Sequence, residues 1–335
     1  MLLQISRMKT PEELREFYER ELLPDLTVLE RRRRRIVGGI VLTEIAEIGI
    51  IAGAVVFLFF KYKGLDRSEY LDLVMNVYYF LPALLVIGFI NIMAFRGIRK
   101  AFTTDFKTYI IARLVRFVDE GLNYSQNRKI SEVDFTRSQI FGGRPGVYNG
   151  DDLVYGTIGK TRVEFSEVHA DRKESWSPIP EDCALFHGLF FIGEFNKHFN
   201  CRVVILPDIY ATFPGEIGRK LEGFGRDERL RLEDVEFEKY FAAYSNDQVE
   251  ARYILSTSLM ERIVEFRKKT GRDVHISFVD SAVFLAISYT RKLFEPRLFR
   301  TIVDFEPVRQ YYEDLALAVG IVDDLNLNRR IWSKR

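Results

Sequence analysis

Two long apolar runs near the N-terminus constrain the fold of this 335-residue chain more than any other feature. The first run covers Ile36 to Phe60 and the second covers Leu73 to Phe95, with a short polar connector between them. A run of about 20 apolar residues matches the hydrocarbon core of a bilayer, which is about 30 Å thick. The sequence therefore predicts a transmembrane helical hairpin, and two buried helices of a soluble protein are the alternative.

The charges that flank the two runs predict the orientation of this hairpin. A block of five arginines precedes the first run and a second basic cluster follows the other, whereas the connector 61–72 mixes both signs. Because basic excess stays on the cytoplasmic side, we expect both termini to be cytoplasmic. The block could also bind anionic headgroups, or it could only set the topology. The basic residues expected to face lipid are Arg31, Arg32, Arg33, Arg34, Arg35, Arg96, Arg99 and Lys100.

Polar side chains within the runs need partners, because a charge at membrane depth is costly. The first run contains Glu44 and Glu47, and the second contains Asn91. If the connector pairs Phe60 with about Val74, Glu44 lies beside Asn91, and a protonated Glu44 would bond to the amide. The alternative is that the membrane span starts later, which leaves both glutamates at the cytoplasmic interface.

The remaining sequence predicts an α+β chain with cytoplasmic parts on both sides of the hairpin. Thr10 to Glu13 has the pattern of a helix N-cap followed by a capping box, and Pro24 is expected to end that helix. An amphipathic helix is expected over 105–120, with Gly121 ending it. The predicted regions are a cytoplasmic amphipathic helix with a basic juxtamembrane segment (1–35), the hairpin (36–95, with spans at about 36–60 and 73–95), a juxtamembrane connecting helix (96–130) and a cytoplasmic α+β domain (131–335).

Antiparallel strands and a C-terminal helix are expected within the α+β domain. Alternating apolar residues predict a hairpin of strands around Asp280, and Pro307 is placed to open the final helix. The segment Gly156 to Thr161 ends like a phosphate-binding loop, but Val154 occupies the position of the required opening glycine. This segment is therefore expected to be a turn between strands.

Composition argues against several classes of site. The net charge of +1 gives no electrostatic case for nucleic acid. The chain has two cysteines, Cys183 and Cys201, which indicate no disulfide framework on a reducing cytoplasmic face. Nucleophilic catalysis needs a Ser or Cys with a positioned base, and no such signature accompanies a histidine. We therefore predict no catalytic, cofactor-binding or metal-binding residue and no cofactor. The four histidines, expected to be structural or at the surface, are His169, His187, His198 and His275.

Three segments of the chain resemble one bacterial family of membrane proteins, which is catalogued as a domain of unknown function. They are FEKYFAAYSNDQVEARYILSTSLMER (237–262), the turn at 156–161 and YYEDLALAVGIVDDLNLNRRIW (311–332). The resemblance covers roughly 105–335 and the plan of two N-terminal spans. It implies a cytoplasmic domain tethered to the bacterial inner membrane and a partner of the LemA type, because the family's genes often neighbour those of LemA-type proteins.

Polar residues within the first of these segments are candidates for a family-specific surface. Asp247, Glu250 and Arg252 form this candidate. Helix capping by Asp247 and an ion pair of Arg252 are the structural alternative.

These observations predict a multi-pass inner-membrane protein whose cytoplasmic domain acts as a non-enzymatic interaction or scaffolding module. One alternative is a domain that reads anionic lipid, and another is a membrane-tethered enzyme of unidentified chemistry. Membrane lipids, a LemA-type protein and a second copy of this chain are the expected partners, and nucleic acid is not.

Overall fold

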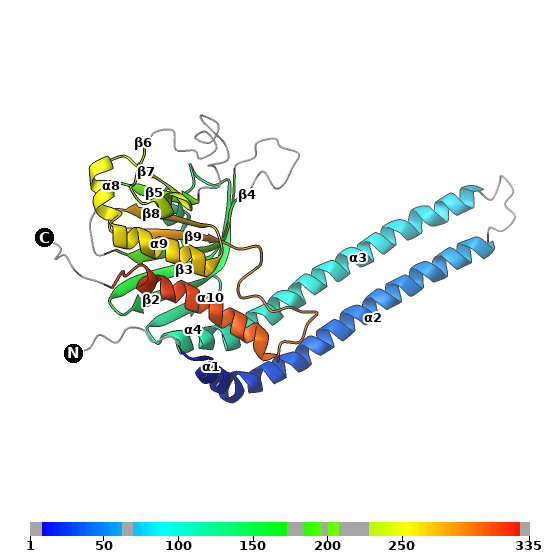
Figure 1. Ribbon diagram of the computed structural model, residues 1–335. Coiled ribbons are helices and arrows are strands. Elements are labelled where there is room, and N and C mark those ends of the chain that lie inside the picture. Colours follow the sequence, from blue (N-terminus) through cyan, green and yellow to red (C-terminus); the bar gives the residue numbers. More distant parts are fainter. Residues whose placement is uncertain (1–8, 62–69, 173–183, 196–199, 208–227, 329–335) are drawn as a thin grey trace. The chain divides into compact units, whose positions relative to one another are not determined.

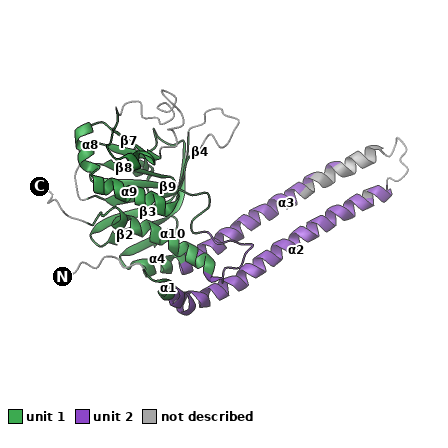
Figure 2. Ribbon diagram, viewed as in Figure 1, with its two compact units in different colours: residues 1–14, 111–294, 306–335 green, residues 15–110, 295–305 purple. Residues whose placement is uncertain are grey.

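The computed structural model describes residues 9–61, 70–172, 184–195, 200–207 and 228–328 (Figure 1). The chain divides into two compact units (Figure 2). Unit 1 comprises residues 1–14, 111–294 and 306–335, and unit 2 comprises residues 15–110 and 295–305. The structure is a mixed α+β chain, as the sequence predicts, with a long apolar helix near the N-terminus, an antiparallel sheet and a C-terminal helix.

Helices occupy most of the first 118 residues. Their bounds are α1 (Pro11–Phe17), the π-helical η1 (Tyr18–Leu22), α2 (Leu23–Lys61), α3 (Tyr70–Phe106), the π-helical η2 (Lys107–Ile111) and α4 (Ala112–Val118). The predicted capping box forms at the start of α1. The Thr10 amide donates to Glu13 Oε2 at 2.7 Å, and the Glu13 amide donates to Thr10 Oγ1 at 3.2 Å.

The expectation that Pro24 ends the first helix is wrong. The chain stays helical through this residue, and the wider turns of η1 immediately precede it. Leu23 donates its amide to the carbonyl of Tyr18, five residues back. A proline lacks an N–H and its ring clashes with the preceding turn, and such conflicts are commonly absorbed by a π-type widening.

The helical segment Pro11–Lys61 is long and apolar enough to cross a membrane, and among the described residues it is the one helix with this property. Its second half leaves large apolar side chains exposed. These include Val41, Leu42, Ile45, Ile48, Ile50, Ile51, Val55, Val56 and Phe57. The connector residues 62–69 lie outside the described residues.

Unit 1 is built on one nine-stranded sheet in the order β1-β2-β3-β4-β9-β8-β5-β7-β6, with antiparallel pairing throughout. The strands are β1 (Leu122–Ser125), β2 (Val147–Ile158), β3 (Thr161–Asp171), β4 (Ala184–Glu194), β5 (Val203–Pro207), β6 (Glu228–Arg229), β7 (Phe241–Ser245), β8 (Val274–Val279) and β9 (Ala282–Ser288). The helices that accompany them are α5 (Glu132–Arg137), α7 (Val235–Glu238), α8 (Gln248–Ile254), α9 (Thr257–Thr270) and α10 (Phe305–Asp324).

Both faces of this sheet are covered. One face carries a core in which Phe135 of α5 packs with Phe186 and Phe190 of the sheet, and Phe190 packs with Phe284. Helices α9 and α10 lie across the other face (Figure 1). This double cover explains why β5 is buried along its whole length and reads as a continuous apolar run.

Local turn predictions in unit 1 are confirmed. The segment after β2 is a two-residue turn, Gly159-Lys160, which joins β2 directly to β3 and does not open a helix. Gly159 has a φ of 60°, which glycine adopts without strain. Strands β8 and β9 form the expected hairpin at Asp280. The final helix includes Pro307 in its first turn and buries Val308.

Candidate functional site

A glutamate lies buried on β3, the third strand in the order of the sheet. Glu167 of β3 is 2% exposed and points to the face that carries Phe165 and Phe191, because side chains two residues apart share a face. An unpaired carboxylate at this depth would be costly. Its partners therefore decide what this site does.

Two histidines approach the same carboxylate oxygen of Glu167. His169 follows two residues later on β3, and His187 lies directly opposite His169 on β4. The distance from His169 Nε2 to Glu167 Oε1 is 3.1 Å, and from His187 Nε2 it is 3.4 Å. The two imidazole rings are stacked, with centroids 3.6 Å apart. Strand pairing thus places two nitrogen donors and one oxygen donor together.

The second oxygen of Glu167 is held by the backbone. The amide of Leu293 donates to Glu167 Oε2 at 2.9 Å. This bond fixes the carboxylate in one orientation and directs Oε1 towards the histidines. A backbone donor in this position is typical of the outer shell that orients a metal ligand.

Two further carboxylates reach Glu167 from the neighbouring strand. Asp151 of β2 pairs with Glu167 in the sheet, and the strand register shifts between Asp151 and Val154. Within this irregularity Asp152 adopts a positive φ of 62°. Such a bulge re-aims side chains, and carboxylate oxygens of Asp151, Asp152 and Glu167 all lie within 4.8 Å of one another. The hydroxyl of Tyr124 donates to Asp152.

Burial and neighbouring groups disfavour the protonated form of one imidazole of this group. Burial lowers the pKa of His187 below its usual value of 6.5, and the neighbouring His169 lowers that pKa further, while Glu167 opposes both effects. A neutral imidazole has a nitrogen lone pair available for a metal ion. Lys292 also lowers the pKa of His187, so a cation is already near the site.

Among the described residues, two overlapping groups of side chains could hold a metal ion, and Glu167 belongs to both. One group is Glu167, His169 and His187, and the other is Asp151, Asp152 and Glu167. Neither group is predicted from the sequence, from which we expected no metal-binding residue. The spacing of Glu167 and His169 places both on one face of a strand, but the approach of His187 depends on strand pairing.

The predicted membrane residues occupy unit 2, and their pairing differs from expectation. The amide nitrogen of Asn91 on α3 bonds to Glu47 on α2, whereas Glu44 was the expected partner. Arg32 of α2 bonds to Asp105 of α3. The bond to Glu47 in place of Glu44 differs by three residues, about one helical turn, from the expected alignment of the two helices. Glu44 is exposed on α2.

The basic residues expected to face lipid fall into two groups. Arg33 is buried at 8% exposure and bonds to both oxygens of Glu30, so it is not available to lipid. Arg32, Arg34 and Arg99 form ion pairs with acidic residues of the same unit. The basic side chains that remain exposed without an ion pair to a described residue are Arg31, Arg35, Arg96 and Lys100.

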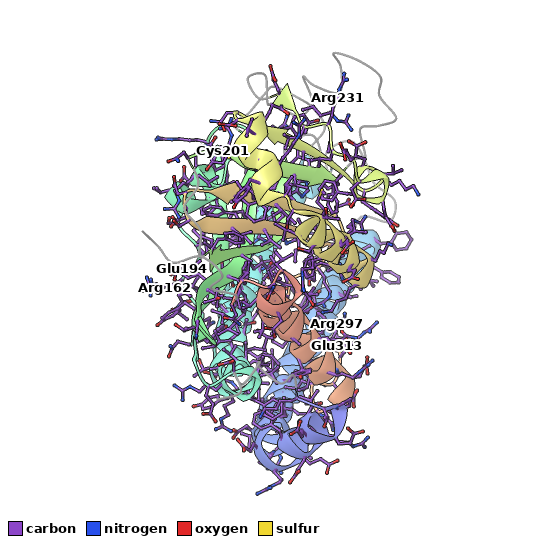
Figure 3. All side chains as sticks on the ribbon, turned by 60° about the vertical axis from the view of Figure 1, so that its left-hand side comes forward. Arg162, Glu194, Cys201, Arg231, Arg297 and Glu313 are labelled. Carbon is purple, nitrogen blue, oxygen red and sulfur yellow. The ribbon has the colours of Figure 1, made fainter. Side chains whose placement is uncertain are left out.

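The candidate family surface lies on α8. Asp247 caps this helix by accepting from the amides of Val249 and Glu250, as the structural alternative expects. Glu250 accepts from the amide of Asn200, and Arg252 is exposed. Cys201 lies beside α8 (Figure 3), and burial together with Glu250 raises the pKa of its thiol to about 11. Cys183 and His198 lie outside the described residues.

Comparison with known proteins identifies one domain in this chain. The domain described as "Protein of unknown function (DUF3137)" is found at residues 184–327, which agrees with the resemblance to a domain of unknown function. No curated protein shows a significant match.

Among solved structures, the crystal structure of the mycobacterial trehalose monomycolate transport factor A, TtfA, is similar at 12% sequence identity and a TM-score of 0.30. The match covers 62% of this chain and 95% of that chain. Similarity at this level does not establish a shared fold.

Proposed function

We propose that this chain is a membrane-anchored interaction module, in which α2 and α3 form a two-span anchor and the α+β domain binds a protein partner at the cytoplasmic face of a bacterial inner membrane. The observation that carries the anchor is the exposure of the apolar side chains of α2. Soluble proteins rarely expose a contiguous apolar surface of more than a few hundred Å². A bilayer is the environment that removes such a surface from water.

The proposed orientation rests on the positions of the exposed cations. Arg31 and Arg35 lie on α2 just before its apolar part, and Arg96 and Lys100 lie on α3 just after its apolar part. Basic residues that flank membrane spans stay on the cytoplasmic side. Both termini and the α+β domain would then be cytoplasmic.

The surface proposed for a protein partner is the outer face of α8. Val249 is 80% exposed and Tyr253 is 60% exposed. They are four residues apart and therefore lie on the same side of the helix. Asp247 and Glu250 rim this pair and are held by bonds to backbone amides. A rigid helix with an apolar pair and a polar rim is suited to a protein contact, and a LemA-type membrane protein is the class that the family resemblance implies.

Gentle extraction of the full-length protein from its native membrane, followed by mass spectrometry, tests this proposal. We expect a stoichiometric protein partner that survives high salt and that is lost from the Val249→Ser, Tyr253→Ser double variant. Val133→Ser is the matched control, because Val133 of α5 is 76% exposed outside the proposed surface. Recovery of the chain in the soluble fraction would contradict the anchor, and a partner that is retained equally by all variants would contradict the α8 surface.

A lipid-reading function is the second candidate, favoured by the exposed cations on both helices. Anionic headgroups attract each such residue by about 1 kcal/mol. If this function is correct, anionic lipids will be enriched in the extract, no protein will be stoichiometric, and Arg31→Gln with Arg35→Gln will reduce the enrichment. Equal lipid content in the variant would exclude it.

A further inference from the structure

The group formed by Glu167, His169 and His187 has the donor atoms and spacing of a metal site. Two ligand atoms bound at 2.0–2.2 Å to a tetrahedral ion lie about 3.3–3.5 Å apart. The two distances from the imidazole nitrogens to Glu167 Oε1 are 3.1 and 3.4 Å. The ligand atoms of all three residues lie within 4.8 Å of one another. The two rings are stacked, so they would have to turn towards a common point for both lone pairs to bind one ion together with Glu167.

We propose that Glu167, His169 and His187 bind one divalent transition-metal ion of the zinc class. Two imidazoles and one carboxylate are a ligand set that zinc uses, and three protein ligands leave a fourth position open to water or another molecule. The site would give this chain a metal-binding function that is independent of the proposed anchor and protein partner.

The surroundings of the three ligands support binding of an ion. The Leu293 amide holds the second oxygen of Glu167, so that the first oxygen remains directed at both histidines. Asp151 and Asp152 bring further negative charge within 4.8 Å of a Glu167 oxygen. Lys292 is the charged residue that opposes binding, since it acts on His187 as a nearby cation. The three carboxylates of Glu167, Asp151 and Asp152 outnumber this one cation, so the surrounding charge favours binding of a positive ion.

The choice of metal class follows from the nitrogen ligands. Calcium and magnesium take oxygen ligands almost entirely, whereas imidazole suits zinc, iron, copper and nickel. The oxygen-only group of Asp151, Asp152 and Glu167 would instead suit a hard cation. However, Asp152 is already engaged by the hydroxyl of Tyr124. The alternative without any ion is a hydrogen-bonded cluster in which both histidines donate to Glu167.

Titration of the full-length protein in detergent, after removal of bound metal with a chelator, tests the proposal. With Zn²⁺ as the probe, we expect one equivalent per chain and a dissociation constant in the micromolar range or lower. His169→Ala and His187→Ala should each weaken binding by at least about 10-fold. His198→Ala is the matched control, since it removes an imidazole from another part of the sequence, and it should leave the affinity unchanged. Lys292→Ala should strengthen binding, a change that a purely structural cluster would not produce.

Chemical modification of the unaltered protein tests the proposal even if the histidine variants fail to fold. Zn²⁺ should protect His169 and His187 from acylation by diethyl pyrocarbonate, as mapped by mass spectrometry. The proposal is overturned if no saturable Zn²⁺ binding occurs below millimolar concentration, or if Zn²⁺ fails to protect these two residues. Preferential binding of Ca²⁺ or Mg²⁺ would also overturn it and would point to the oxygen-only group.

Discussion

Among the described residues, each of the two units buries one glutamate, and the partners of these glutamates differ in one respect. Glu30 in unit 2 accepts from Arg33, from Arg34 and from the backbone amide of Ile302. Glu167 in unit 1 lies against two histidines and accepts from the backbone amide of Leu293. Arginine is always protonated in proteins, whereas a histidine is able to lose its proton and present a lone pair.

Because of this difference, Glu30 forms a structural ion pair, whereas Glu167 belongs to a candidate metal-binding site. The Arg33 guanidinium holds the pKa of Glu30 at about 2, against the opposing effect of burial. Arg33 also donates to the carbonyl of Leu298, so the ion pair ties α2 to the segment 295–305. With both arginines charged, Glu30 has no place for a metal ion. At Glu167 a metal ion could bind, because a neutral histidine offers a nitrogen lone pair.

The largest effect is expected from Glu30→Gln, which leaves the Arg33 charge buried without its counter-ion. Breaking a buried pair in this way costs about 3–5 kcal/mol. Hydrogen exchange of the amides in 295–305 should accelerate by roughly two orders of magnitude or more. Removal of both charges with Glu30→Gln and Arg33→Met should restore part of the protection. Unchanged exchange in the single variant would show that the pair does not hold this segment.

Lowering the pH should weaken the same ion pair between Glu30 and Arg33, because it protonates Glu30. The pKa of Glu30 is lowered from 4.5 to about 2 in the folded chain. Its stabilisation is therefore complete above pH 4.5 and is lost as the pH falls from 4.5 to about 2. The difference between the two pKa values corresponds to about 3 kcal/mol. Exchange in 295–305, corrected for intrinsic rates, should show this acid step in the natural chain and lose it in Glu30→Gln. An identical acid step in both chains would exclude Glu30 as its source.

Glu167→Gln should have a smaller effect than the corresponding change at Glu30. In the metal-free protein the amide oxygen still accepts one hydrogen bond, and no permanently charged partner is left unpaired. A cost of about 1–3 kcal/mol is expected from the lost bond to a buried group. Hydrogen exchange at the Leu293 amide is the local measurement. A cost equal to that of Glu30→Gln would show that burial of Glu167 depends on its partners as strongly as burial of Glu30 does, contrary to the comparison.

The smallest effect is expected from Arg34→Ala. The side chain of Arg34 is 72% exposed although it shares an oxygen of Glu30 with Arg33. Exposed ion pairs contribute at most about 1 kcal/mol, so exchange in 295–305 should rise by less than about fivefold. Arg20→Ala removes another exposed i,i+4 ion pair of this unit and is the matched control. A loss of protection as large as that of Glu30→Gln would make Arg34, and not Arg33, the main partner.

Features set by neighbouring residues could be read from the sequence. The capping box at Thr10, the cap of α8 at Asp247 and the hairpin turn at Asp280 form as predicted, because each depends on bonds or backbone preferences within a few residues. The apolar runs likewise indicated a helix able to cross a membrane. Pro24 shows the limit of such rules, because a π-helical turn absorbs the proline and the helix continues.

The sequence alone determined the fold class, the long apolar helix and the local caps and turns, since these follow from short-range patterns of polarity and backbone preference. Only the tertiary structure decided that Glu47 and not Glu44 bonds to Asn91, that Arg33 is buried, and that His187 meets Glu167 and His169. Each of these depends on the alignment of segments far apart in the chain. Such alignment follows from the packing of whole elements, which no local pattern of residues specifies.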